Sequence, residues 1–220
     1  MRIVIAGAHG QVARRLGRLL SARGDTVVGI IRNPDHQGDL REDGVEPVVL
    51  DLEQASVDDV ARVLTGADAV VFAAGAGPGS GAARKHTVDR GAAVLLADAA
   101  ERAGVRRYLL VSSMGVEQAR TGTPPGMDPV FAAYLQAKLA AEDAILPRTA
   151  LETVILRPGR LTDDAGTGRV TLAHGVDHGQ IPRDDVAAVL LALLDARTAD
   201  VVVELVSGHT PVDEAVAALP

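Results

Sequence analysis

A tyrosine and a lysine stand four residues apart in the segment Tyr134-Leu-Gln-Ala-Lys138. On a helix, residues at this spacing share one face. A free tyrosine has a pKa of about 10, too high for efficient acid–base chemistry at neutral pH, and a nearby ammonium group favours the phenolate. The pair therefore predicts a proton donor at Tyr134 that is tuned by Lys138. The alternative is an ordinary tyrosine and lysine on a surface helix.

The chain opens with an apolar segment that runs into a glycine turn. Residues 3–6 predict a buried strand, and Gly7-Ala-His-Gly10-Gln-Val-Ala13 follows directly. Gly7 suits a tight turn because glycine adopts positive φ freely, and a side chain at Gly10 would block a phosphate. A helix begins after Gly10, so its first N–H groups would face an anion. The motif predicts a dinucleotide-binding turn, and the alternative is an ordinary tight turn. The residues expected to bind are Gly7, His9, Gly10, Gln11 and Val12.

Arg32 and Asn33 follow the second predicted strand, at residues 26–31. In a dinucleotide-binding sheet, this position meets the adenosine ribose. An acidic side chain there binds the 2′-hydroxyl of NAD(H), whereas an arginine pairs with the 2′-phosphate of NADP(H). Arg32 with Asn33 therefore favours NADP(H), unless Arg32 is simply a solvated surface residue.

Two later segments are expected to border the same nucleotide site. Asp51 follows the third predicted strand, and its carboxylate could accept the adenine amino group while Leu52 lies against the ring. Asp51 could equally be a helix cap or a turn residue. The small residues Ala73, Ala74 and Gly75 would let the backbone pass close to a cofactor, although Gly75 also suits a turn.

Ser113 follows the fifth predicted strand, and its hydroxyl could hydrogen-bond a substrate oxygen. With a nicotinamide cofactor, the candidate side chains predict reduction of a small carbonyl, quinone or similar acceptor. The cofactor would supply hydride and Tyr134 the proton. Lys138 would tune Tyr134 and hold the ribose, and Ser113 would orient the carbonyl.

The composition limits the classes of protein to which this chain can belong. Its 220 residues are 47% hydrophobic, which suits one α/β domain with an ample core. The lack of cysteine excludes disulfides and thiolate chemistry. The net charge of −7 and the lack of a basic run argue against nucleic-acid binding, and no apolar run reaches the ~20 residues that a membrane span needs. The first residues do not resemble a signal peptide, so we expect a cytoplasmic protein with a small-molecule substrate; its oligomeric state stays open.

Strands alternate with helices along the chain, which predicts a parallel sheet with right-handed crossovers. Predicted strands cover residues 3–6, 26–31, 47–50, 69–74, 108–111, 153–156, 169–172 and 201–206. One predicted helix begins after Gly10, and further predicted helices cover residues 85–103, 130–146, 183–195 and 211–219. We therefore expect a Rossmann-type, doubly wound α/β fold in a single domain. In such sheets the ligand lies beyond the carboxyl ends of the strands.

A series of motifs matches a known protein family, in order, along nearly the whole chain. They are Gly7-Ala-His-Gly10, Ile31-Arg32-Asn33-Pro34, Asp51-Leu52, Ser112-Ser113, Tyr134-x-x-x-Lys138, Leu156-Arg157-Pro158-Gly159 and Ile181-Pro182-Arg183-Asp184-Asp185-Val186. In these motifs the chain resembles the atypical short-chain dehydrogenase/reductase superfamily. The resemblance is to its short NAD(P)H-binding branch, which includes flavin/biliverdin-reductase-like and nitrogen-regulator-like proteins.

The resemblance implies a Rossmann core with NADP(H) over residues 1–158 and a small C-terminal region, residues 159–220, that lines the substrate cleft. It implies Ser113, Tyr134 and Lys138 as the catalytic triad positions, and cofactor contacts near Pro158. Two residues of the glycine turn depart from the family pattern, since a histidine replaces a frequent threonine and an alanine replaces the last glycine. We expect neither departure to abolish binding.

Two alternatives to an oxidoreductase follow from the same resemblance. Some proteins of this branch bind cofactor without known turnover, so the chain could be a non-catalytic NADP(H)-binding sensor with protein partners. A sugar-nucleotide epimerase or dehydratase fits less well, because the resembling enzymes carry a larger substrate lobe than residues 159–220 provide.

Two further clusters do not predict a metal site. His174 and His178 have a spacing that would suit a metal on a helix, but the glycines beside them predict a loop near the cleft. Asp184 and Asp185 look like paired carboxylates, yet they open a predicted helix, where acidic side chains favour the positive end of the dipole.

Overall fold

The apolar runs of the sequence form the strands of one large sheet and a small second one. The computed structural model describes residues 1–77 and 79–220; Pro78, in the predicted loop at residues 75–81, lies outside them. The strands of the large sheet are β1 (Arg2–Ala6), β2 (Thr26–Ile31), β3 (Glu46–Val49), β4 (Ala69–Phe72), β5 (Arg107–Val111), β6 (Glu152–Pro158), β8 (Arg169–Ala173), β10 (Val201–Ser207) and β11 (Thr210–Pro211). The small sheet pairs β7 (Arg160–Thr162) with β9 (Gln180–Pro182).

Helices of different lengths connect these strands. The longer α-helices are α1 (Gln11–Arg23), α3 (Val57–Leu64), α5 (Ala93–Ala103), α6 (Pro129–Ile145) and α7 (Arg183–Asp195). The shorter ones are α2 (Gln37–Glu42), α4 (Ala82–Arg84) and α8 (Val212–Ala217). Two 3₁₀ turns, η1 (Pro34–His36) and η3 (Val116–Ala119), and one π-helical segment, η2 (Lys85–Ala92), complete the described part of the chain.

The large sheet has the order β11-β8-β10-β6-β5-β4-β1-β2-β3. From β10 to β3 the neighbouring strands are parallel, whereas β8 runs antiparallel to β10 and β11. The strand order reverses between β1 and β4, as in doubly wound nucleotide-binding sheets. The predicted Rossmann-type α/β fold is therefore confirmed.

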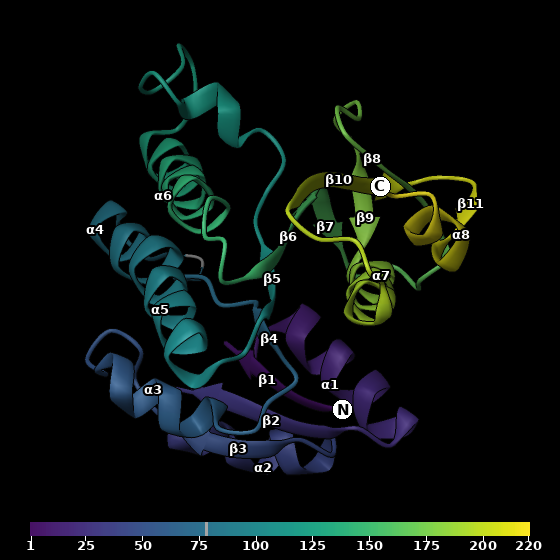
Figure 1. Ribbon diagram of the computed structural model, residues 1–220. Helices are drawn as coiled ribbons and strands as arrows, with labels where there is room; N and C mark the ends of the chain where they lie inside the picture. The colour runs from purple at the N-terminus through teal and green to yellow at the C-terminus, as the bar shows by residue number, and fades with distance from the viewer. Residues whose placement is uncertain (78) are drawn as a thin grey trace.

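Helices cover both faces of this sheet (Figure 1). Along β1, Ile3 and Ile5 point into a core shared with α1 and α7, whereas Val4 and Ala6 point into a core shared with α3, α5 and α6. This division follows from the two-residue period of a strand. Because both faces are buried, the strand is apolar throughout rather than alternating.

Most predicted elements are present, with shifted ends. The strand at residues 26–31 and the helix at residues 183–195 have the predicted bounds. The helix predicted at residues 85–103 begins earlier, at Ala82, and includes the π-helical segment η2. The sequence reasoning did not predict α2 or α3. The last helix begins one residue later than predicted, because Thr210 and Pro211 pair with β8 as a strand, and it ends earlier, at Ala217.

The turn after β1 lies tightly against the end of β4. Gly7 has a φ of +77°, and a Cβ at this position would lie 2.5 Å from Ala74 Cα. The N–H groups of Gly7 and Ala8 both donate to the carbonyl of Ile30, at 3.1 and 3.2 Å. The turn is thus confined between the ends of β2 and β4, and the predicted need for glycine is confirmed.

We expect Gly7→Ala to lower the free energy of unfolding by at least about 2 kcal/mol, because it adds backbone strain and overlap with Ala74. Gly38→Ala is the matched control, since Gly38 lies in α2 with nothing within 4 Å of its added Cβ. Urea unfolding followed by circular dichroism measures both variants. Equal stability of the two would contradict the proposed packing constraint.

Candidate functional site

A cleft of about 540 Å³ opens at the carboxyl ends of the strands, where the strand order reverses. Small-molecule sites typically measure about 300–1,000 Å³. The ends of the first four strands supply most of its lining, and Arg84, Val88 and Ala92 supply the rest from α4 and η2. The cleft therefore lies where a doubly wound sheet binds its ligand.

The start of α1 forms one end of this cleft. Gly10 is the N-cap residue, and neither a side-chain cap nor an acidic residue occupies the first turn. The first N–H groups of a helix have no partner within the helix, so they remain available to an anion. A Cβ at Gly10 would lie 3.1 Å from the Gly7 carbonyl oxygen and 3.6 Å from that of Ala73. The bare backbone here fits a pyrophosphate.

Two arginines meet one carboxylate beyond the ends of β2 and β3. Glu53 Oε2 accepts hydrogen bonds from Arg32 Nη1 at 3.2 Å and from Arg84 Nη2 at 2.8 Å. Thr87 Oγ1 donates to Glu53 Oε1 at 2.6 Å. Sequence reasoning identified Arg32 but missed Glu53 and Arg84. Glu53 stands next to the predicted Asp51-Leu52 motif, which was the available signal for it, whereas no local pattern pointed to Arg84.

A pair of histidines borders the same end of the cleft. The rings of His9 and His36 stack with centroids 3.5 Å apart, and His9 Nε2 lies 2.7 Å from Asp39 Oδ2. The hydrogen bond with His9 holds the pKa of Asp39 below its ordinary value. Asn33 also borders the cleft, and its Oδ1 caps η1 by accepting the Asp35 N–H at 3.0 Å.

The structure gathers most of the predicted cofactor-binding residues around the cleft. They are Gly7, His9, Gly10, Arg32, Asn33, Asp51, Leu52, Ala73, Ala74 and Gly75. The remaining predicted residues lie outside its lining: Gln11 is exposed, Val12 packs in the core, Pro158 is buried at the end of β6, and Lys138 is buried on α6. Asp51 Oδ1 accepts the Glu53 N–H at 3.0 Å, so its turn role is confirmed and its adenine role stays a prediction.

Lys138 is buried and binds the ends of two strands. Its Nζ donates to the carbonyls of Ala74 at 3.3 Å and Val111 at 3.0 Å. The same atom lies 3.4 Å from Asp89 Oδ1, an ion pair without hydrogen-bond geometry. Asp89 is fully buried on η2, and its Oδ2 accepts the Ala76 N–H at 3.2 Å. Lys138 thus attaches α6 to the border of the cleft.

Tyr134 lies one turn before Lys138 on α6, as predicted. The Lys138 Nζ is 5.9 Å from the centre of the Tyr134 ring. A second ammonium group, that of Lys85, lies 5.5 Å from the same ring. The expected cation beside Tyr134 is present, and sequence reasoning did not predict the second one.

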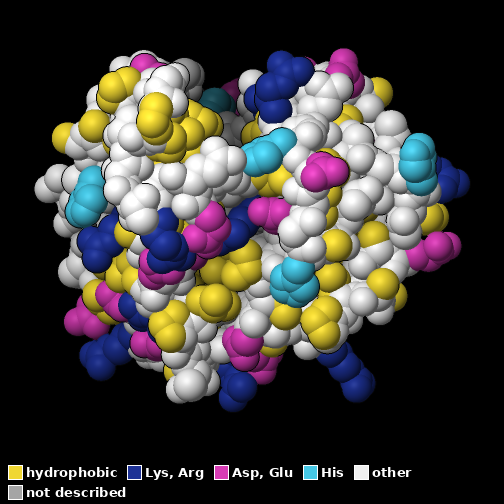
Figure 2. Space-filling view, turned by 90° about the horizontal axis from the view of Figure 1, so that it is seen from above, with side chains coloured by type: hydrophobic (Ala, Val, Ile, Leu, Met, Phe, Trp, Pro, Cys, Tyr) yellow, Lys and Arg dark blue, Asp and Glu magenta, His cyan; other side chains and the backbone are white. Residues whose placement is uncertain are grey.

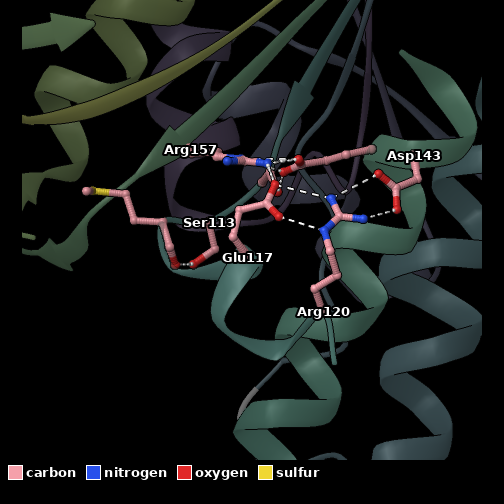
Figure 3. Close-up of polar contacts among 8 residues, drawn as sticks. Ser113, Glu117, Arg120, Asp143 and Arg157 are labelled. Atoms are coloured by element: carbon pink, nitrogen blue, oxygen red, sulfur yellow. Dashed lines mark hydrogen bonds and ion pairs between the residues drawn. The ribbon is translucent and has the colours of Figure 1, made fainter. Parts of the chain in front are cut away.

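The two serines after β5 have different surroundings. Ser113 Oγ donates to the carbonyl of Met114 at 3.1 Å, whereas the buried Ser112 Oγ donates to Glu142 on α6. Arg157 donates from Nε to both oxygens of Glu142 at 3.1 Å and from Nη2 to Glu117 at 3.0 Å. In Figure 3, Ser113 therefore lies beside this network rather than within it.

Arg120 extends the network to the surface by bridging Glu117 and Asp143 (Figure 3). Hydrogen bonds from Arg120 and Arg157 hold the pKa of Glu117 below its ordinary value. Burial alone would lower the pKa of Arg157, but pairing with Glu142 raises it overall. The chain after β5 is thus held against α6 by ionised groups.

Asp184 and Asp185 open α7, as predicted, and they hold the loop that precedes β8. Asp184 Oδ2 accepts the Gly166 N–H at 3.3 Å, and Asp185 Oδ1 accepts the Gly168 N–H at 2.8 Å.

The predicted loop around His174 and His178 is confirmed. Among residues 1–77 and 79–220, no three His, Cys, Asp or Glu side chains converge as a metal site would require.

The surface mixes opposite charges. On the face shown in Figure 2, lysine and arginine side chains lie among aspartate and glutamate side chains.

Within the described part of the chain, no helix has both the length and the apolar character needed to cross a bilayer.

The chain is similar to several known proteins in sequence and in structure. Residues 7–197 match the family described as NAD(P)H-binding. An "uncharacterized sugar epimerase YhfK" of Bacillus subtilis is 33% identical over 98% of both chains. Among solved structures, a "putative NAD-dependent epimerase/dehydratase" of Bacillus halodurans is 35% identical with a TM-score of 0.89, covering 100% of both chains. ChuY of Escherichia coli O157:H7, titled "an anaerobillin reductase", is 27% identical with a TM-score of 0.79, covering 94% of this chain and 97% of its own.

We expect Glu142→Gln to lower the free energy of unfolding by about 3 kcal/mol, because it leaves the guanidinium of Arg157 without its buried partner. The matched control is Asp143→Asn, which removes the neighbouring charge where the side chain is 55% exposed. The control should cost less than about 1 kcal/mol. Urea unfolding at neutral pH compares the two, and similar losses would show that burial does not distinguish these ion pairs.

Proposed function

The chain belongs to the NAD(P)H-binding family, and from this we propose that it is an NADP(H)-dependent oxidoreductase that reduces a small carbonyl, quinone or similar acceptor. The observation that best supports the proposal is the bond between Lys138 Nζ and the carbonyl of Ala74. Ala74 lines the cleft, and Tyr134 lies one turn before Lys138. The helix that carries the candidate proton donor is therefore attached to the border of the candidate cofactor site, while Tyr134 itself is not among the residues that line the cleft.

The residues of the cleft fit a nicotinamide dinucleotide. The glycine turn offers bare N–H groups to a pyrophosphate, and Arg32 offers a guanidinium to a 2′-phosphate. When bound, the cofactor would supply hydride. Tyr134 would donate the proton, the ammonium group of Lys138 would stabilise negative charge on the phenol, and Ser113 would orient the substrate oxygen.

The names of the similar proteins include both epimerase and reductase. We favour a reductase because much of the chain after residue 158 completes the main sheet as β8, β10 and β11. Because α7 and α8 pack into the core, only β7, β9 and the loops beside them remain to cover a substrate, which suits a small acceptor better than a sugar nucleotide.

A non-catalytic NADP(H)-binding regulatory protein remains the second candidate. It would use the same cleft and the same cofactor contacts, so binding alone cannot separate the two functions. Turnover separates them: NADPH oxidation against a panel of carbonyls, quinones and flavins should depend on Tyr134 in an enzyme. NADPH binding without turnover on any acceptor would favour the regulatory protein.

We expect Tyr134→Phe to reduce turnover at least ~100-fold while the Kd for NADPH changes less than about twofold, because the variant removes only a proton donor. Tyr108→Phe is the matched control. Its hydroxyl is fully buried and donates to the carbonyl of Ala93 at 2.9 Å, so a substrate oxygen cannot reach it. Steady-state NADPH oxidation measures both variants. Turnover of Tyr134→Phe equal to that of the control would remove the assigned proton donor.

We expect Arg32→Ala to weaken NADPH binding at least ~10-fold, because a charge-assisted hydrogen bond to the phosphate is lost. The affinity for NADH should be unchanged, since NADH lacks that phosphate. Arg102→Ala, which removes an exposed arginine outside the cleft, is the control. Isothermal titration calorimetry gives the dissociation constants of both nucleotides for the wild type and the two variants, and parallel losses for both nucleotides in Arg32→Ala would contradict a phosphate contact.

A further inference from the structure

Glu53 is the most enclosed member of the charged group at the edge of the cleft. Its side chain is 19% exposed, against 54% for Arg32 and 36% for Arg84. Both guanidinium groups reach the same oxygen, Oε2, while Thr87 donates to the other. One carboxylate therefore organises two cations that face the cleft.

A guanidinium binds a carboxylate and a phosphate through the same N–H groups. The arginine N–H groups that Glu53 occupies are therefore ones that a phosphate oxygen could use. The negative charge of Glu53 would also repel a phosphate, and Asp51, whose Oδ1 accepts the Glu53 N–H, adds to that repulsion. A ribose hydroxyl has no such conflict, because a carboxylate can accept its hydrogen bond.

We propose that Glu53 and Arg84 set how strongly this chain prefers NADPH over NADH. Glu53 competes with the 2′-phosphate for both arginines and thereby limits the preference, and Arg84 is a second phosphate-binding residue beside Arg32. This inference rests on the proposed function. It adds the residues that determine the choice of nucleotide at that site.

The competing interpretation is that Glu53 only orders the start of the helix that carries Arg84 and Thr87. Glu53→Gln distinguishes the two, because the amide oxygen can still accept hydrogen bonds from the arginines and the amide NH2 can donate to Thr87 Oγ1, while the side chain carries no charge. An ordering role predicts equal effects on both nucleotides. Competition with phosphate predicts tighter binding of NADPH without tighter binding of NADH.

The test measures dissociation constants for NADPH and NADH by calorimetry at fixed ionic strength, for the wild type, Glu53→Gln, Arg84→Gln and Glu46→Gln. Glu46 is exposed on β3 outside the cleft, so its variant controls for the change in net charge. We expect Glu53→Gln to tighten NADPH binding about threefold to tenfold without tightening NADH binding. Arg84→Gln should weaken NADPH binding about tenfold and leave NADH binding unchanged.

Raised salt should shrink the gain of Glu53→Gln, because added ions screen the charges at this partly exposed site. A ratio of NADH to NADPH dissociation constants that is unchanged in Glu53→Gln overturns the competition. Equal loss of both nucleotides in Arg84→Gln overturns its phosphate role. If the wild type binds neither nucleotide, the proposed function fails as well, whereas binding with unchanged ratios overturns this inference alone.

Discussion

The close approach of Gly7 to Ala74 is the constraint on which the candidate site depends. There is no room for a Cβ between the turn after β1 and the end of β4. This contact sets the start of α1 directly at the cleft, where its first N–H groups face outward. The carbonyl of Ala74 then accepts a hydrogen bond from Lys138. A single backbone contact therefore links the glycine turn to the helix that carries Tyr134.

The buried ammonium of Lys138 extends this link to a third element. Burying a charge is costly unless it is paired and hydrogen-bonded. Two strand carbonyls and the carboxylate of Asp89 surround the ammonium group. Asp89 reaches it from the π-helical segment η2, a type of local distortion that often occurs at functional sites. The border of the cleft, α6 and η2 are thus joined through the interior.

Two groups of charges in this protein differ in how far they are buried, and that difference separates their functions. Glu142 and Arg157 are largely buried and bond to each other as well as to Ser112 and Glu117, so they hold the chain after β5 in place. Arg32 and Arg84 lie at the edge of the cleft, where a ligand could replace their partner Glu53 at little cost of desolvation. A buried ion pair stabilises the fold, whereas a partly exposed ion pair at the edge of the cleft can exchange its partner for a ligand.

The sequence by itself determined the fold class, most strands, the glycine turn and the Tyr134–Lys138 spacing. These features depend on the local pattern of apolar residues and on the conformational freedom of Gly7. Both can be read from a short stretch of sequence. The sequence could not determine which partners bind Lys138, which serine is buried against Glu142, or that Arg84 joins Arg32 at Glu53. Such contacts join segments far apart in the chain, as Arg84 and Glu53 are separated by 31 positions. Only the tertiary packing decides them, because the energy of a buried or shared charge depends on the groups that the fold brings around it.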